Sequence, residues 1–215
     1  PSAFMSTVHT RRVNVQPQSP KQRAATLGPM GCIFPSLYHS IGDSSRRRSR
    51  TLQLVAETYD DMATVLVAGV MSEVLAEEIQ GNQSHNWESV LTQVTDAIAS
   101  DLPQYDLGDL PSQLMLWGQK IDEFLSESDT CTPENLDALQ HELGVPHETA
   151  SREVMVFMAM IKYVLHTTED PFSRVCTLAR WGDTSATQCA LATSILAARL
   201  GCDWIDMNRF VDADR

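Results

Sequence analysis

The chain has 215 residues, 43% of them apolar, and a formal net charge of −12, so its length suits one sizeable hydrophobic core. No stretch approaches the roughly 18 uninterrupted apolar residues that a membrane-spanning helix needs, and a body this acidic would repel nucleic acid. We therefore expect a soluble protein with no membrane span and no nucleic-acid partner.

Positive charge is concentrated near the N-terminus, where residues 1–50 carry eight Lys/Arg and one acid, while the remainder carries eight Lys/Arg and 27 acids. Residues 1–28 show no apolar period and no apolar block of the kind that marks a secretory signal, so we expect a flexible basic tail. A single helical domain over residues 29–210 should follow. The arginine run at 46–50 is interpreted as a solvated loop, with contact to an acidic partner or a phosphate as the alternative.

Apolar residues then recur at helical spacing along the rest of the chain. The spacing predicts helices over 52–56, 62–79, 86–102, 114–125, 133–143, 151–167, 171–181 and 184–200. Gly81 and Gly201 mark helix ends, and Thr132-Pro133 and Asp170-Pro171 mark helix starts. The segment 151–167 is apolar on most sides and should lie in the middle of the bundle. The sequence therefore predicts an all-α fold, a bundle of about seven to nine helices.

Five cysteines, an odd number without a Cys-x-x-Cys pair, favour reduced thiols and a cytoplasmic location. The equally spaced Cys176, Cys189 and Cys202 are interpreted as small core side chains, because their interval does not match the spacing of zinc ligands. His141 and His147 flank a Gly-Val-Pro turn and are expected to be exposed loop residues.

One region carries a resemblance to a known family. Residues 153–204 contain a buried helix, an Asp-Pro-Phe helix start and a Gly-Asp turn that opens a helix of small residues. This order resembles the C-terminal signature of the ADP-ribosylglycohydrolase family, and the matching residues are Asp170, Phe172, Ala179, Gly182, Asp183 and Thr184. Residues 28–43 and 54–81 are similar, more weakly, to the middle portion of that family, and residues 86–145 match only in helical character.

The resemblance implies a helical bundle that holds two magnesium ions and hydrolyses an ADP-ribosyl N- or O-glycosidic linkage. The family takes its ligands from an early Thr-Asp-Asp cluster and a late Asp-x-Asp-Thr turn, since hard cations require several oxygen ligands. In this chain Asp183 matches the first ligand of the late turn. Ser185 stands where the second carboxylate is expected, and Ala186 stands where the hydroxyl is expected.

The early cluster has an imperfect counterpart in Asp60 and Asp61. These paired carboxylates begin a predicted helix, but Tyr59 precedes them where the family has threonine. They are candidate magnesium ligands, and the alternative is that they cap the N-terminus of the helix. Trp181, which precedes the late turn, is expected at the mouth of any remaining pocket, where it would stack a base or plug the site.

Two functions follow from these residues. The first is a degenerate, non-catalytic family member that serves as a binding or structural subunit, with a protein partner or a second copy of itself and without a cofactor. The alternative is a magnesium-dependent hydrolase that uses Asp183 with Asp60 and Asp61. The missing ligands favour the first, because a site for two ions cannot easily spare two of its ligands.

Overall fold

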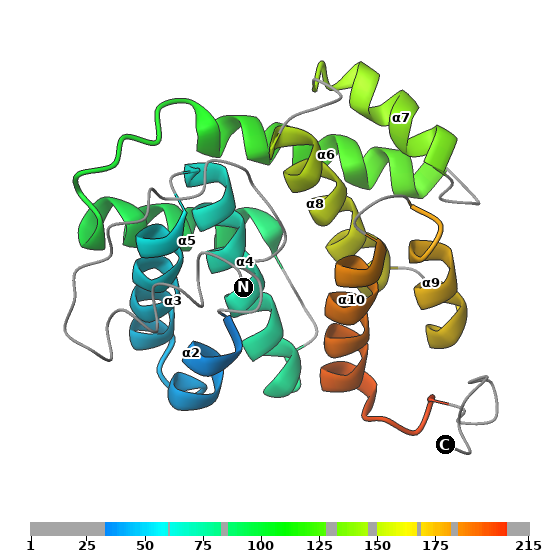
Figure 1. Cartoon of the computed structure of the whole chain (residues 1–215), viewed down its shortest axis with the longest axis horizontal. Helices are drawn as coiled ribbons and strands as arrows, with labels where there is room; N and C mark the ends of the chain where they lie inside the picture. The colour runs from blue at the N-terminus through cyan, green and yellow to red at the C-terminus, as the bar shows by residue number, and fades with distance from the viewer. Residues whose placement is uncertain are drawn as a thin grey trace.

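Helices form the regular secondary structure over the residues that the computed structural model describes, which are 33–59, 61–82, 86–127, 133–145, 150–166, 169–181 and 185–205. They are α2 (Ile33–Ser40), α3 (Ser44–Thr58), α4 (Met62–Ile79), α5 (Trp87–Asp101), α6 (Leu110–Glu127), α7 (Pro133–Glu142), α8 (Ala150–His166), α9 (Pro171–Leu178) and α10 (Ser185–Leu200). This arrangement confirms the predicted all-α bundle (Figure 1). The predicted basic tail, residues 1–28, lies outside the described part of the chain.

Short polar side chains set where several helices begin. In each case a side-chain oxygen accepts a hydrogen bond from the backbone N–H three residues later, at 2.8–3.1 Å, and so satisfies a donor that has no partner within the helix. The capping residues are Asp43, Asp61, Asn86 and Asp170. At the other end, Gly81 and Gly201 follow α4 and α10 with φ of 78° and 74°, a conformation that glycine adopts without steric cost.

Two helices, α4 and α8, form the centre of the core. Every residue of α4 from Thr64 to Ala76 is buried, because α2, α3, α5, α8 and α10 all pack around it. In α8 the residues from Val154 to Leu165 are buried, as the apolar pattern of this segment predicted. The remaining helices each bury one face against these two, which is the usual solution for amphipathic helices.

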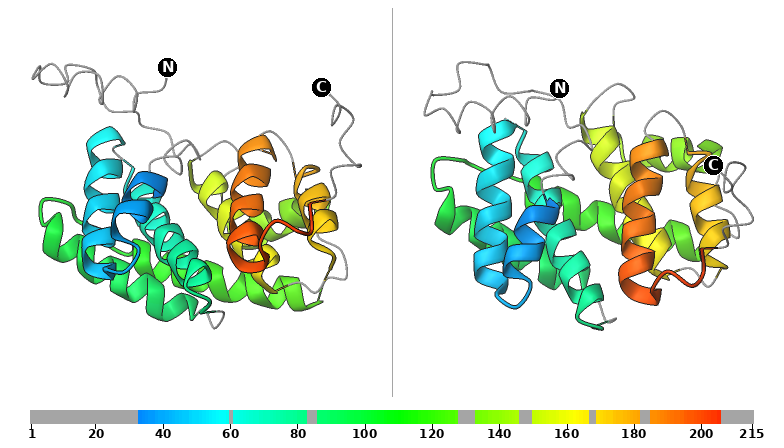
Figure 2. Two further views of the ribbon diagram at one scale, coloured as in Figure 1. Left: turned by 90° about the horizontal axis from the view of Figure 1, so that it is seen from below. Right: turned by 60° about the horizontal axis from the view of Figure 1, so that its bottom comes forward.

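The helices form two groups. Figure 1 shows α2 to α5 on one side and α7 to α10 on the other, while α6 contacts both α5 and α8 and so links the groups. Figure 2 shows this from two further directions. The C-terminal ends of α4, α8 and α10 meet between the groups. There the Arg199 guanidinium donates to the Leu165 carbonyl at 2.7 Å and lies 3.7 Å from the Glu78 carboxylate. From this point α4 and α10 diverge toward their N-terminal ends (Figure 1).

The interpretation of the arginine run as a solvated loop is wrong. Residues 46–50 belong to α3, and Arg47 is buried against α4. Its guanidinium makes a two-point contact with the Glu73 carboxylate, with Nε 3.2 Å from Oε1 and Nη2 2.6 Å from Oε2. A buried arginine is acceptable here because its charge is neutralised and its donors are satisfied.

Other expectations also need correction. Cys176 and Cys202 are exposed and Cys189 is half-buried, so these cysteines are not core side chains. The reason is local: Cys176 lies on α9 opposite the buried Arg174 and Leu178, and Cys202 follows the end of α10. His141 is exposed as expected, but it lies in α7 rather than in a loop. His147 lies outside the described residues.

Candidate functional site

The late turn joins α9 to α10. Asp170 caps α9, and Ser185 begins α10, so Ser185 and Ala186 form the first turn of that helix. Asp183, the predicted magnesium ligand, lies outside the described residues. Helices α9 and α10 flank this segment, and the neutral residues Ser185 and Ala186 stand at the start of α10.

Asp61 caps the N-terminus of α4. Its Oδ2 accepts hydrogen bonds from the backbone N–H of Thr64 at 2.8 Å and from the Thr64 hydroxyl at 2.6 Å. A carboxylate bonded in this way to the first turn is stabilised by the positive end of the helix dipole. This geometry matches the capping alternative for Asp61. Asp60, its neighbour in the pair, lies outside the described residues.

The two candidate ligand groups lie on different helices that point their N-terminal ends apart. Asp61 is at the N-terminal end of α4, and the late turn leads into the N-terminal end of α10. Figure 1 shows these ends separating, whereas the C-terminal ends are joined through Glu78 and Arg199. Among the described residues, no three His, Cys, Asp or Glu side chains are grouped closely enough to hold a metal ion.

Trp181, which was singled out from the sequence, directly precedes Gly182 and Asp183 of the late turn. Its side chain is only 3% exposed, and its ring packs against Tyr163 of α8 with 5.5 Å between centroids and a tilt of 49°. The Tyr163 hydroxyl donates to Glu169 at 2.9 Å, which fixes the ring that Trp181 rests on. The indole is therefore buried against α8.

Ion pairs that involve a buried cation are the feature that the sequence did not reveal. Besides Arg47 and Glu73, the ammonium of Lys162 in α8 lies 2.6 Å from the Asp122 carboxylate of α6 and 5.2 Å from the ring centre of Trp87. A charged residue inside an apolar helix was a visible signal, since Lys162 interrupts the apolar run of α8. The partners could not be inferred, because they lie far away in the sequence. Each pair joins two helices, which gives these charges a structural role.

The C-terminal end of α8 is capped by arginines from other helices. Arg174 of α9 donates to the carbonyl of Val164 at 2.9 Å and to that of Glu169 at 2.8 Å. Arg199 of α10 donates to the carbonyl of Leu165. Burial lowers the pKa of Arg174, and the nearby charge of Arg199 lowers it further. Cations at a helix C-terminus oppose its partial negative charge, so these contacts fix α9 and α10 against α8.

Two other groups have altered acidity. Burial raises the pKa of Glu153 in the first turn of α8, and one of its carboxylate oxygens is enclosed without a hydrogen-bond partner. Burial, followed by the nearby Cys176 thiol, raises the pKa of Cys189, whose Sγ lies 3.6 Å from the Val175 carbonyl. Neither group belongs to a set of three or more His, Cys, Asp or Glu side chains that could hold a metal ion among the described residues.

One hollow in the described surface lies between α3 and α5, with a volume of about 330 Å³. Its polar lining consists of Ser45, Arg48, Gln93, Asp96, Ser100 and Asp101. Arg48 is already held by Gln93 at 3.0 Å and by Glu73 at 3.3 Å, so its charge is not free for a ligand. The hollow is on the group of helices opposite to the late turn and does not include any of the residues predicted from the sequence.

Comparisons with protein families, with curated proteins and with solved structures found no match to this chain. Within the described residues, no helix is long and apolar enough to cross a membrane.

Proposed function

We propose that the chain is a degenerate ADP-ribosylglycohydrolase-like protein that acts as a non-catalytic binding or structural subunit with a protein partner. The observation that carries the proposal is the late turn, in which Ser185 and Ala186 replace a carboxylate and a hydroxyl. Losing a carboxylate removes one unit of charge from a hard-cation site, and losing the hydroxyl removes a ligand. The cap formed by Asp61 supports the proposal, because its carboxylate is already bonded to the first turn of α4.

Contacts between helices join the described elements on both sides of this turn. They include the ion pairs Arg47–Glu73 and Arg199–Glu78, the hydrogen bond from Arg174 to the Val164 carbonyl, and the packing of Trp181 on Tyr163. A fold can be kept without the activity of its family. Such a framework can therefore serve as a rigid binding surface. The proposal includes a cytoplasmic location, which the reduced state expected for the cysteines supports.

Magnesium titration by calorimetry tests this proposal. We expect no binding in the micromolar range, and the variant Asp183→Ala should behave like the parent protein. The variant that combines Ser185→Asp with Ala186→Thr rebuilds the family's late turn. It should gain affinity only where further carboxylates lie near Asp183. Micromolar magnesium affinity in the parent protein that disappears in Asp183→Ala contradicts the proposal and supports the magnesium-dependent hydrolase.

A further inference from the structure

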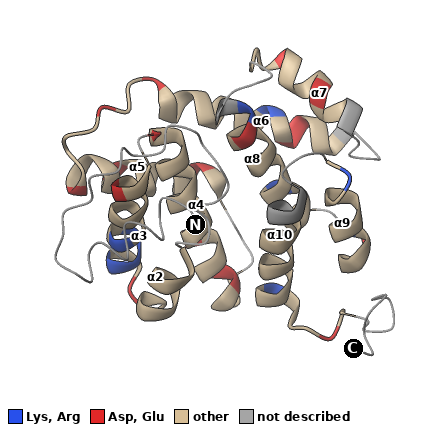
Figure 3. Ribbon diagram, viewed as in Figure 1, with Lys and Arg blue, Asp and Glu red and all other residues tan. Residues whose placement is uncertain are grey.

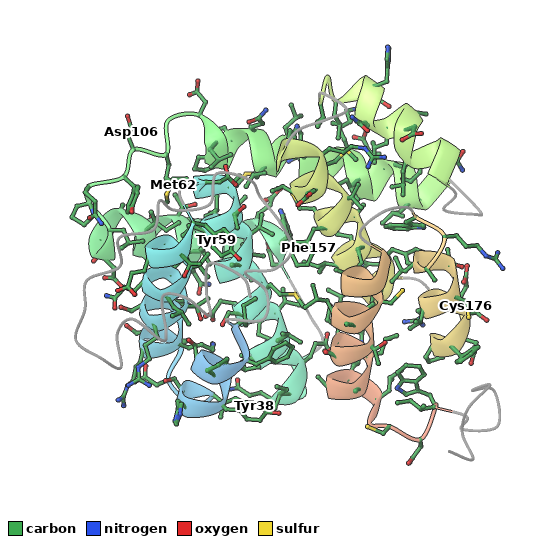
Figure 4. The ribbon with its side chains drawn as sticks, in the orientation of Figure 1. Tyr38, Tyr59, Met62, Asp106, Phe157 and Cys176 are labelled. Carbon is green, nitrogen blue, oxygen red and sulfur yellow. The ribbon has the colours of Figure 1, made fainter. Side chains whose placement is uncertain are left out.

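Two free thiols lie near each other where α9 packs against α10. Cys176 is exposed on α9 (Figure 4), and Cys189 is half-buried in the second turn of α10. Cys189 Sγ lies 3.6 Å from the carbonyl oxygen of Val175, the residue directly before Cys176. That oxygen and the Cys176 Cα belong to one planar peptide unit and are about 3 Å apart. Cys189 Sγ is therefore at most about 7 Å from the Cys176 Cα.

This proximity is within the range that a disulfide requires after a small adjustment. The Cα atoms of two bonded cysteines are usually about 4–7 Å apart. Each cysteine carries its sulfur on a single rotatable bond with staggered positions, so a change of rotamer moves the exposed Cys176 sulfur relative to Cys189 while the backbone of α9 stays in place. Burial raises the pKa of Cys189, and the nearby Cys176 thiol raises it further, so the two thiols also interact electrostatically.

The surroundings of the pair suit oxidation at Cys176. The sequences of α9 and α10 contain arginines but no Asp or Glu, and Figure 3 shows both helices without acidic side chains. A cysteine reacts with peroxide as its thiolate, a form that adjacent carboxylates would disfavour. Cys176 is exposed to solvent, whereas Cys189 is half-buried and has a raised pKa. An oxidant in solution should therefore react first with Cys176.

We propose that Cys176 and Cys189 form a reversible disulfide that joins α9 to α10 when the protein meets hydrogen peroxide. The Cys176 thiolate attacks the peroxide, becomes a sulfenic acid and releases hydroxide, which takes up a proton to form water. The Cys189 sulfur then attacks the sulfenic sulfur, and the hydroxyl group leaves with the Cys189 proton as a second water. Two thiols are thus oxidised to one disulfide while one peroxide is reduced to two waters. This inference does not depend on the proposed subunit role.

Peptide mapping of the full chain tests the proposal. Trypsin cleaves after Arg174, Arg180 and Arg199, so the two cysteines fall on separate peptides, 175–180 and 181–199. The reduced, folded protein is exposed briefly to hydrogen peroxide, and the remaining thiols are alkylated before digestion. Mass spectrometry should find the two peptides joined, and dithiothreitol should separate them. The joined pair should exceed any pair that contains Cys202 by at least about tenfold, because neighbouring thiols react at a high effective concentration.

Serine variants assign a role to each sulfur. Cys202→Ser is the matched control, since Cys202 is another exposed cysteine outside the pair, and it should leave the disulfide unchanged. Cys189→Ser should abolish the disulfide and raise the trapping of the Cys176 sulfenic acid by dimedone about tenfold, because the thiol that consumes this intermediate is gone. Cys176→Ser should abolish both the disulfide and this trapping. Far-UV circular dichroism confirms that each variant is folded.

Three outcomes overturn the proposal. A joined pair that forms only in urea would mean that the folded helices hold the two sulfurs too far apart. Equal dimedone trapping in the parent protein and in Cys189→Ser would mean that Cys189 does not attack the sulfenic acid. A dimer linked through Cys176 on a non-reducing gel, in place of the internal disulfide, would assign the exposed thiol to a contact between two chains.

Discussion

Removing Arg47 should destabilise the protein strongly, although the residue comes from a run of surface-like arginines. Its side chain is 4% exposed and that of Glu73 is 6% exposed. The variant Arg47→Met leaves the Glu73 carboxylate buried, with Arg48 at 3.3 Å as its remaining cationic neighbour. Breaking a buried ion pair by removing one partner costs about 3–5 kcal/mol of unfolding free energy. Because Arg48 stays close, we expect a value near the lower limit, about 3 kcal/mol.

The double variant Arg47→Met with Glu73→Met separates the cost of an orphaned charge from the cost of lost packing. It removes both charges. Arg47 also donates to the carbonyls of Ser40 and Ile41, and each of these carbonyls accepts a hydrogen bond from a second donor that the double variant retains. Ser40 accepts from the Asp43 backbone at 3.0 Å, and Ile41 accepts from Gln80 at 2.6 Å. Replacing a buried pair by apolar residues of similar volume is often neutral. We therefore expect the double variant to lose less stability than Arg47→Met alone.

Urea unfolding at neutral pH, followed by circular dichroism, measures these differences in a double-mutant cycle. Arg46→Met is the matched control, since Arg46 is exposed on the same helix and its side chain should contribute little. A loss below about 1 kcal/mol in Arg47→Met would refute the reasoning, because a surface residue gives that value. Strict additivity of the two single variants would refute it as well.

Three further predictions follow from the packing and the caps. Gly69→Ala places a Cβ 2.6 Å from Val94 Cγ1 and 3.0 Å from Leu52 Cδ2, so it should lower stability in urea by about 1–3 kcal/mol, whereas Gly42→Ala, with open space around it, should not. Asp61→Ala should cost about 0.5–2 kcal/mol by loss of the cap, and Asp61→Asn should retain most of the stability, since both residues cap well; a loss as large in Asp61→Asn as in Asp61→Ala would contradict the capping role. Burial raises the pKa of Glu153 above the ordinary value of a glutamate, so the folded state holds this proton more tightly than the unfolded state. Stability therefore falls as pH rises through the range between the pKa values of the unfolded and folded states. Glu153→Gln should therefore gain stability relative to the parent protein as pH rises from about 4 to 7, and a gain that is the same at both pH values would contradict this cause.

Much of the helical pattern could be read from the sequence. The helices from α4 to α10 follow from apolar spacing, from capping residues such as Asp170 and from end glycines such as Gly81, because these signals are local. The short α2 was not predicted, and α3 was expected to begin only near Arg50. The polar segment before Leu52 was expected to be solvated. The burial of Arg47 could not be predicted from it, because that burial depends on a glutamate 26 residues later in the chain.

The candidate site was less predictable. The first turn of α4 gave a local reason for Asp61 to be a cap, and the structure bears that geometry out. The position of Trp181 depended on Tyr163, a contact between residues on separate helices that no local pattern encodes. The contact between Glu78 and Arg199, which joins the C-terminal ends of α4 and α10, also links distant parts of the chain. The surroundings of Asp183 lie outside the described residues.

The measurement that tests the central claim most directly is hydrolysis of ADP-ribosyl-arginine by the purified protein in magnesium, followed by mass spectrometry of the released ADP-ribose. Because Ser185 and Ala186 stand where the proposed family relationship implies two ligands, we predict no release above the rate in buffer alone, and no difference between the parent protein and Asp183→Ala. Release of ADP-ribose that requires magnesium and is lost in Asp183→Ala would contradict the account and show that the protein is a hydrolase.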